Sequence, residues 1–224
     1  MATPFVIEHL GRVGSTQDEA RIRYRRGPLL VTASGQDAGR GRSGHEWIEA
    51  DRGMAASLAF ELDWPGEAMA RITLVAGLAA TDVLPDSIGL KWPNDVMVGD
   101  QKIGGIISES ADGLVVVGFG MNVFWKSPPV GMGAVHASDP GEKYSRVTAE
   151  RWAEALLDRI GAGSDHWGRE QYVARCTTIG RLIKWEPGGS GLAVGVADDG
   201  ALLVESGPKV IPLYAGIIQE IRPS

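Results

Sequence analysis

The chain has 224 residues, of which 44% are hydrophobic and 22% are charged, and its net charge is −6 at neutral pH. This length allows one large domain or a main domain with a small appendage. The acidic balance argues against a general nucleic-acid binder, which normally carries a basic surplus. The sequence contains no secretory signal pattern and no apolar run as long as a membrane span. With Cys176 as its single cysteine, no disulfide can form within the chain. We therefore expect a cytoplasmic protein without nucleic-acid or membrane partners.

Two helices and three strands are expected in the first 83 residues. Thr16 followed by Glu19 is typical of a capping box, which predicts a short helix that ends at Gly27. Apolar residues at helical spacing predict a longer helix over 67–83. Strands are expected at 6–10, 29–33 and 54–62.

The middle of the chain predicts an antiparallel meander. Its strands are separated by tight turns at Gly99-Asp100 and Asp112-Gly113, and they cover residues 88–92, 95–98, 102–110 and 114–123. Pro, Gly and Ser are frequent over 126–147, which indicates a loop. Thr148 is expected to cap the next helix, and a further helix is expected over 164–175.

From residue 179 onward the pattern consists of five short strands with Gly-rich turns, which predicts a small barrel. We place a domain boundary near residue 177. The expected fold class is α+β: residues 1–177 form a mixed, largely antiparallel sheet with helices, and residues 178–224 form the barrel.

The loop Gly39-Arg40-Gly41-Arg42-Ser43-Gly44 allows several interpretations. It matches the G-x-G-x-x-G pattern of dinucleotide-binding proteins. Glu61 stands where that pattern places an acidic residue that binds the ribose. A Rossmann fold also needs a helix that starts at the glycines, whereas residues 45–53 are polar and lack an apolar stripe. A Walker-type loop lacks its Gly-Lys-Ser/Thr. A solvated surface turn is the plain structural alternative.

Other segments favour a function for this loop. The chain resembles biotin protein ligases over nearly its whole length, including the small C-terminal barrel. The matching segments are, in chain order, Gln36, Gly39 to Gly44 with Trp47, Lys91-Trp92-Pro93-Asn94-Asp95, Lys102-Ile103-Gly104-Gly105 and Gly118-Phe119-Gly120-Met121-Asn122. The resemblance implies the class II synthetase-like catalytic fold of biotin and lipoate ligases and an SH3-like barrel.

The chain also departs from the family pattern. Ser43, His45 and Glu46 stand where many members have basic residues, and Gly14 stands where some have an acid. We expect the substitutions at Ser43 and His45 to loosen the loop and the hold on its adenylate. The sequence begins directly with the catalytic domain, so the resemblance implies a monofunctional type without a DNA-binding domain.

The implied reaction has two steps. The carboxylate of biotin attacks the α-phosphate of Mg-ATP, which gives biotinyl-adenylate and pyrophosphate. A lysine of a biotin carboxyl carrier protein or domain, part of a biotin-dependent carboxylase, then takes the biotinyl group. The family often pairs edge strands into homodimers.

The resemblance assigns roles to the charged residues. Lys102 is placed on the carboxylate and α-phosphate, although a lone lysine beside a hairpin turn would ordinarily be solvated. Arg40 and Arg42 resemble a pair that grips phosphate, on a mobile loop that Gly41 allows to close over the adenylate. Lys91, Asn94 and Asp95 are implied to contact ATP, with Asp95 as the magnesium ligand or as a residue that fixes the turn.

The neutral candidates lie in other segments. Ser15, Thr16, Gln17 and Gln36 are placed around the ureido ring of biotin by the resemblance, although the first three could also begin a helix. Trp47 resembles an adenine-stacking residue but could equally belong to the core, and Trp92 is expected to be structural. Asn122 is implied to reach the adenine, and Gly104 and Gly105 to approach the ligand.

Two alternatives to a biotin ligase stay open. A lipoate ligase or octanoyl transferase has the same fold, and fold by itself does not separate these activities. A non-catalytic sensor of biotin or adenylate is the other hypothesis. The presence of Lys102 together with Arg40 and Arg42 argues against the sensor.

Overall fold

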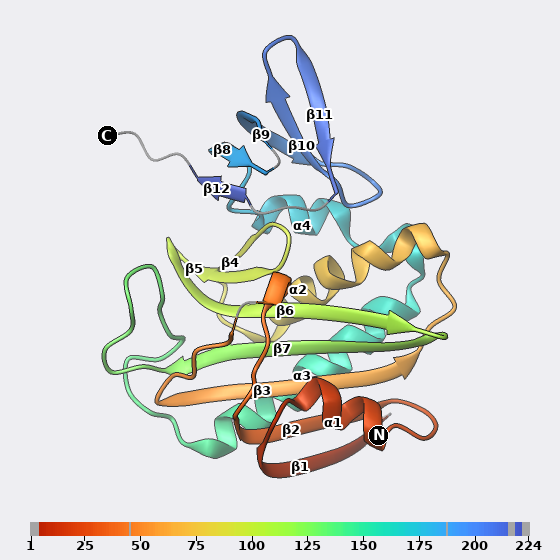
Figure 1. The fold of residues 1–224 in the computed structure, drawn as a ribbon, viewed down its shortest axis with the longest axis vertical. Coiled ribbons are helices and arrows are strands. Elements are labelled where there is room, and N and C mark those ends of the chain that lie inside the picture. Colours follow the sequence, from red (N-terminus) through yellow and green to blue (C-terminus); the bar gives the residue numbers. More distant parts are fainter. Residues whose placement is uncertain (1–4, 45, 187, 215–217, 221–224) are drawn as a thin grey trace.

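The computed structural model describes residues 5–44, 46–186, 188–214 and 218–220. They form two β-sheets, and helices cover the larger sheet (Figure 1). This mixed α+β architecture agrees with the expected fold class.

The larger sheet has seven strands in the order β1-β2-β3-β7-β6-β5-β4. β1 and β2 are parallel, and every other neighbouring pair is antiparallel. The predicted meander over β4 to β7 is confirmed. The strands are β1 (Val6–Val13), β2 (Leu29–Gln36), β3 (Arg52–Glu61), β4 (Ile88–Lys91), β5 (Asp95–Val98), β6 (Gln101–Ala111) and β7 (Leu114–Phe124).

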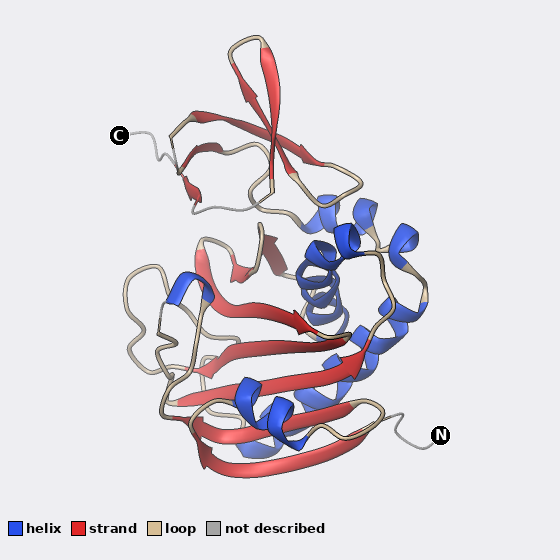
Figure 2. Cartoon of the chain, turned by 45° about the vertical axis from the view of Figure 1, so that its right-hand side comes forward, coloured by secondary structure: helices blue, strands red, loops and turns tan. Residues whose placement is uncertain are grey.

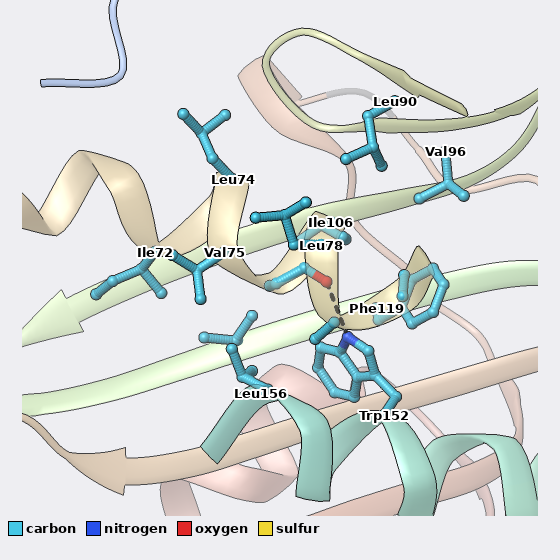
Figure 3. Packing of buried hydrophobic residues seen from close by; sticks show 14 of the residues in the cluster. Ile72, Leu74, Val75, Leu78, Leu90, Val96, Ile106, Phe119, Trp152 and Leu156 are labelled. Atoms are coloured by element: carbon cyan, nitrogen blue, oxygen red, sulfur yellow. Dashed lines mark hydrogen bonds between the residues drawn. The ribbon is translucent and has the colours of Figure 1, made fainter. Parts of the chain in front are cut away.

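Helices cover both faces of this sheet. α2 (Ile72–Val83) and α3 (Glu142–Gly161) pack on one face, and α1 (Thr16–Arg23) lies on the other (Figure 2). The main core fills the α2/α3 face, where Trp152 donates a hydrogen bond from Nε1 to the carbonyl oxygen of Ala76 at 3.1 Å (Figure 3). A smaller apolar cluster lies under α1 and consists of Ala20, Leu29, Val31, Ala59 and Val116. Each large core side chain contributes about 1.5–3 kcal/mol through burial.

The predicted start of the third helix, at Thr148, is wrong. α3 begins at Glu142, so the expected loop over 126–147 ends earlier, and Thr148 lies buried inside the helix. Ser145 and Thr148 continue the buried stripe of Trp152 toward the N-terminus at helical spacing. The stripe was missed because its first members are polar.

The start of α1 also differs from the prediction. Ser15 is the N-cap residue, and no side-chain capping hydrogen bond forms there, so the predicted capping box is wrong. The hydroxyl of Thr16 is instead committed to tertiary partners, Gln36 and Ser57.

Two predicted helices are divided. The segment expected over 67–83 is a 3₁₀ helix (Gly66–Arg71) followed by α2. The segment expected over 164–175 is a 3₁₀ turn (Ser164–His166) followed by α4 (Arg169–Arg175). Gly168 separates them with φ at +91°, a left-handed conformation that glycine adopts without strain.

The smaller sheet lies beyond α4, at the end of the molecule next to β4 (Figure 1). It has five strands in the order β11-β10-β9-β8-β12, and every neighbouring pair is antiparallel. The outer strands β11 and β12 are not paired with each other in the described part of the chain, so a closed barrel is not confirmed. The strands are β8 (Leu182–Trp185), β9 (Ser190–Val196), β10 (Leu202–Ser206), β11 (Lys209–Leu213) and β12 (Ile218–Glu220).

None of the helices within the described ranges has the length and apolar character needed to cross a membrane.

Candidate active site

A cavity of about 300 Å³ opens on the sheet face that carries α1. Side chains of a strand alternate between its two faces. Ser57 therefore lies on the same face as Ala59, and Gly118 on the same face as Val116, and both cavity residues continue the surface that α1 covers. The start of α1, the end of β2, the loop before β3, the β4–β5 turn, β6 and β12 also contribute to the wall.

One end of the cavity is lined by neutral polar side chains that bind one another. Thr16 donates two hydrogen bonds to Oε1 of Gln36, from its backbone nitrogen at 2.8 Å and from its hydroxyl at 3.1 Å. Ser57 donates its hydroxyl to Thr16 Oγ1 at 2.8 Å. Oε1 of Gln36 already accepts both hydrogen bonds from Thr16. The remaining polar group of the Gln36 side chain is therefore its amide nitrogen, Nε2.

Gln17 is almost completely buried at the same end, with 2% of its surface exposed. Its Nε2 donates to the carbonyl oxygen of Val116 at 3.3 Å. Its Oε1 has no hydrogen-bond partner among the described residues. A Cβ placed on the cavity residue Gly118 would lie 2.8 Å from this oxygen. The neutral end therefore holds one unpaired acceptor beside a glycine. A buried acceptor without a hydrogen bond lowers the stability of the folded protein.

Trp47 lies across the glycines of β6 and β7. A Cβ on Gly120 would lie 3.1 Å from the indole ring, and one on Gly105 would lie 3.4 Å from it. Gly105 and Gly120 are paired across the two strands. The missing side chains at this pair let the indole approach the sheet, so Trp47 is both a packing residue and part of the cavity wall.

The other end of the cavity is charged. Lys102 Nζ lies 2.6 Å from Asp95 Oδ1, and both side chains are partly exposed. Arg42 Nη1 donates to Asn94 Oδ1 at 3.4 Å. Burial lowers the pKa of Arg42 and the nearby charge of Asp95 raises it, so desolvation is the larger effect on this guanidinium.

Arg40 is held by a carboxylate outside the cavity lining. Its two terminal nitrogens donate to the two oxygens of Asp18 at 3.0 and 2.7 Å. Glu109 Oε1 lies 3.8 Å from Arg40 Nη2. The hydrogen bonds that Arg40 donates to Asp18 raise the pKa of Arg40, more than burial lowers it. An incoming anion would have to compete with this bidentate pair.

The β4–β5 turn is attached to the smaller sheet. Trp92 is buried, its backbone nitrogen donates to Thr178 Oγ1 at 2.9 Å, and its Nε1 donates to the carbonyl oxygen of Gly200 at 3.0 Å. Lys91 Nζ lies 3.7 Å from Glu220 of β12, and Ile218 of the same strand lines the cavity. The smaller sheet thus contributes to the site.

A little more than half of the chain matches the model of one protein family. Residues 10–123 match the model described as the biotin/lipoate A/B protein ligase family. The chain belongs to this family.

Curated relatives and solved structures agree with this family membership. A biotin–[acetyl-CoA-carboxylase] ligase of Mycobacterium tuberculosis is 31% identical, over 96% of this chain and 89% of the relative. A protein of the same name from Paracoccus denitrificans is 32% identical, over 83% of this chain and 88% of the relative. The biotin protein ligase of Aquifex aeolicus in complex with biotin and ATP has the same fold, with a TM-score of 0.80 at 23% identity over 97% of this chain and 99% of that one.

In this biotin/lipoate ligase family member, all the predicted binding residues except Gly104 and Asn122 line the cavity. A Cβ on Gly104 would lie 2.9 Å from the carbonyl oxygen of Gly120, so this glycine serves strand packing. Asn122 is fully buried and donates from Nδ2 to the carbonyl oxygen of Gly133 at 2.9 Å. Asn122 is not among the residues that line the cavity, and its Oδ1 has no hydrogen-bond partner among the described residues. That Asn122 reaches the adenine stays a prediction.

The Rossmann interpretation of the Gly39–Gly44 loop is wrong. The loop contains only a 3₁₀ turn (Arg42–Gly44) and leads into β3, which is antiparallel to β2. A dinucleotide site needs a helix at that place. His45 lies outside the described residues, and the expected loosening of the loop by Ser43 and His45 stays a prediction.

Several lining residues of this ligase-family cavity were not singled out from the sequence. Gly118, Phe119 and Gly120 were part of the family resemblance, and the spacing of the two glycines on one strand face was the available signal. Ser57 is hidden in an apolar strand. Ile218 lies 98 residues beyond Gly120, the lining residue that precedes it in sequence, and only tertiary structure brings the last strand to the cavity.

Proposed function

We propose that this chain is an ATP-dependent biotin–protein ligase. It forms biotinyl-5′-AMP from biotin and ATP and transfers the biotinyl group to a lysine of a biotin carboxyl carrier domain. In the first step a bond forms between a carboxylate oxygen of biotin and the α-phosphorus, and the bond to the pyrophosphate leaving group breaks. In the second step the lysine amine attacks the acyl carbon, and AMP leaves with its electron pair.

The observation that carries this proposal is the unpaired Oε1 of Gln17 at the neutral end. The head of biotin is a cyclic urea with two N–H donors and one carbonyl acceptor. Gln17 supplies an acceptor for an N–H, and the amide nitrogen of Gln36 supplies a donor for the carbonyl. Ser15, Thr16 and Ser57 complete a polar wall around a neutral ligand, and each neutral hydrogen bond contributes about 1 kcal/mol.

The charged end suits the reacting groups. Two anions, the carboxylate and the α-phosphate, must meet, so fixed cations lower the barrier. Lys102 is the proposed contact to both, with Asp95 orienting its ammonium at 2.6 Å. Arg40 and Arg42 are the proposed grip on the phosphate, and Gly41 between them gives the loop room to close.

The nucleotide is proposed to lie between Trp47 and the β4–β5 turn. Trp47 offers an aromatic surface for adenine, and Lys91 and Asn94 offer polar contacts in the cavity wall. Gly105 is proposed to let the ligand approach the backbone of β6.

Mg²⁺ is proposed as the metal. Among the described residues no group of three or more His, Cys, Asp or Glu side chains could hold a metal by itself. Mg²⁺ is commonly bound by one or two carboxylates together with substrate phosphates, and Asp95 is placed to be such a carboxylate. Bound there, the ion would neutralise phosphate charge.

The chain is proposed to have two domains, to pair with a second copy and to act in the cytoplasm. Residues 1–177 would form the catalytic domain, and residues 178–224 the SH3-like appendage, whose five short antiparallel strands support this. β1 lies at an edge of the larger sheet, which supports the pairing of two copies through edge strands. The cytoplasm is the proposed compartment, and the buried free thiol of Cys176 supports a reducing environment.

Lipoate is disfavoured by the same observation. Its dithiolane ring has no N–H donor, so it would leave Oε1 of Gln17 buried and unpaired. A sensor without catalysis would not need Lys102, Arg40 and Arg42 in the cavity wall.

The test compares radiolabelled biotin with radiolabelled lipoate, each with ATP and a purified carrier domain. We expect transfer of biotin and biotin-dependent release of pyrophosphate. Transfer of lipoate in place of biotin would contradict the proposal, and binding of biotin without pyrophosphate release would favour the sensor.

A further inference from the structure

Gln36 of the neutral end also borders a second cavity, of about 240 Å³. Gln36, Trp47 and Ala55 line both cavities. The second cavity is also lined by Ser145 and Arg146 of α3, so it lies on the sheet face opposite to α1. Gln36 therefore stands between the proposed biotin site on one face and a cavity with charged walls on the other.

The backbone of Gln36 lies where β2 has lost its neighbour β3. The pairing of β2 with β3 ends at Ala33, opposite Ala55, whereas the pairing of β2 with β1 continues to Gln36. The nitrogen of Asp37 donates to the carbonyl oxygen of Val13 on β1 at 2.8 Å. Because neighbouring residues of a strand direct their peptide groups to opposite sides, those of Gln36 point to the side that β3 has left.

Two charged side chains take the place of β3 at this point. The nitrogen of Gln36 donates to Glu49 Oε1 at 2.5 Å, and its carbonyl oxygen accepts from Arg12 Nη2 at 3.1 Å. Arg12 Nη2 also donates to Glu49 Oε2 at 3.0 Å, and Arg12 Nε donates to Asp37 Oδ1 at 2.5 Å. Arg12 and Glu49 line the second cavity and are not among the residues that line the first.

Arg12 reaches Gln36 by crossing β2 at a glycine. Arg12 on β1 is paired with Gly35 on β2, and paired residues share a face of the sheet. A Cβ on Gly35 would touch Nη1 of Arg12 and would lie 3.3 Å from its Cζ and 3.1 Å from Oε1 of Glu49. The missing side chain at Gly35 therefore gives the guanidinium its path to Gln36.

Gln36 is thus held from both faces of the sheet. On the first cavity's side, Thr16 binds its Oε1 with two hydrogen bonds. On the other side, Arg12 and Glu49 bind its backbone carbonyl oxygen and nitrogen. With the side-chain oxygen and the backbone both fixed, the direction of Nε2 into the cavity is also fixed.

We propose that Arg12 and Glu49 are positioning residues for biotin: they hold the backbone of Gln36 so that its Nε2 faces the carbonyl of the ureido ring. They act through Gln36 from the sheet face opposite to the biotin site. This inference rests on the proposed function, in which the head of biotin binds at the neutral end.

The experiment is a calorimetric titration with biotin of Arg12→Ala and Glu49→Ala, each with and without Gln36→Ala. We expect the Kd for biotin to rise about three- to fivefold in each single variant, because one neutral hydrogen bond changes Kd by about fivefold. With Gln36→Ala present, neither substitution should raise the Kd further. The kcat of pyrophosphate release at saturating biotin should stay unchanged, because the ureido ring takes no part in the reaction.

Two variants separate positioning from a general effect of charge. Gly35→Ala keeps every charge but places a methyl group in the path of Arg12, so it should raise the Kd as Arg12→Ala does and add nothing to that variant. Glu49→Gln keeps an oxygen that can accept from the nitrogen of Gln36, so it should raise the Kd less than Glu49→Ala does. Arg23→Ala is the matched control, because Arg23 is a partly exposed arginine with two carboxylate partners on α1 and β1, and it should leave the Kd unchanged.

A direct measurement of the contact is amide hydrogen exchange at Gln36, followed by NMR. Exchange should become faster in Arg12→Ala and Glu49→Ala and stay as in the wild type in Arg23→Ala.

Equal rises of Kd with and without Gln36→Ala would overturn the inference, as would an unchanged Kd or unchanged exchange at Gln36. If the wild-type protein does not bind biotin, the proposed function fails. Hydrogen exchange at Gln36 then decides by itself whether Arg12 and Glu49 hold this residue.

Discussion

The two ends of the cavity differ in how their polar groups are paired. At the neutral end, Thr16, Ser57 and Gln36 bind one another and leave one unpaired acceptor on Gln17. At the charged end, Lys102 and Arg40 each have a carboxylate partner. The buried Oε1 of Gln17 has no competing partner among the described residues, whereas an anion at the charged end must displace a carboxylate. Affinity should therefore come mainly from the first end and the rate of chemistry from the second.

The largest effect is expected from Lys102→Ala. Loss of its ammonium should lower the rate of adenylate formation about a hundredfold, or about 3 kcal/mol of transition-state stabilisation. Pyrophosphate release at saturating substrates measures this, with Lys126→Ala, on an exposed lysine after β7, as the control. A rate within threefold of the wild type would remove Lys102 from the proposed chemistry.

Gln17→Leu should weaken biotin binding without slowing the chemistry once biotin is bound. The variant keeps the volume of the side chain but removes the buried acceptor, and we expect the Kd for biotin to rise about tenfold, or ~1.4 kcal/mol. Calorimetric titration with biotin and, separately, with ATP measures it. An unchanged biotin affinity would mean that the ureido ring does not bind at the neutral end.

Asp18→Asn should strengthen the binding of anions at the charged end. The substitution removes the charge that competes for Arg40, and exposed ion pairs are weak, so the Kd for ATP or for a non-hydrolysable adenylate analogue should fall about two- to fivefold. Glu19→Gln on the same helix is the matched control, because Glu19 pairs with Arg23 and not with Arg40. Weaker binding in Asp18→Asn would show that Asp18 orients Arg40 and does not compete for it.

The smallest effect is expected away from both ends, at the Arg52–Asp139 ion pair. The hydrogen bond from Arg52 is the main cause that lowers the pKa of Asp139 from 3.8 to about 2. Its pKa in the folded state lies below the unfolded value, so its contribution to stability is present above pH 4 and is lost as the pH falls through about 2. In Asp139→Asn the unfolding midpoint should depend less on pH in this window. Equal pH dependence in both proteins would contradict the shift.

Local signals in the sequence were enough to predict the strands and most of the residues that line the cavity. Alternating apolar residues and Gly-Asp or Asp-Gly turns predicted the meander, because these patterns depend on neighbours in the chain. Family motifs selected most of the residues that line the cavity, because each motif is a short, contiguous run.

Other features could not be predicted, since they depend on contacts between distant segments. Thr16 looked like a helix cap, yet its hydroxyl binds Gln36 and Ser57. The side-chain amide nitrogen of Asn122 binds the carbonyl oxygen of Gly133, in a segment that the sequence predicted only as a loop. The start of α3 was missed because Ser145 and Thr148 are polar residues that only the packed sheet makes into part of a buried stripe.

The sequence by itself determined the family of this protein, its secondary structure in outline and most of the residues that line the cavity, because side-chain chemistry and local spacing carry that information. Only the tertiary structure decided which cation meets which carboxylate, that the last strand reaches the cavity, and that the backbone of Lys102 is hydrogen-bonded to Gly131 and Gly133. Apart from Lys102 and Asp95, which lie on adjacent strands, these pairings join residues tens to hundreds of positions apart. No local pattern encodes a contact that forms only when the sheet, its helices and the second sheet have packed together.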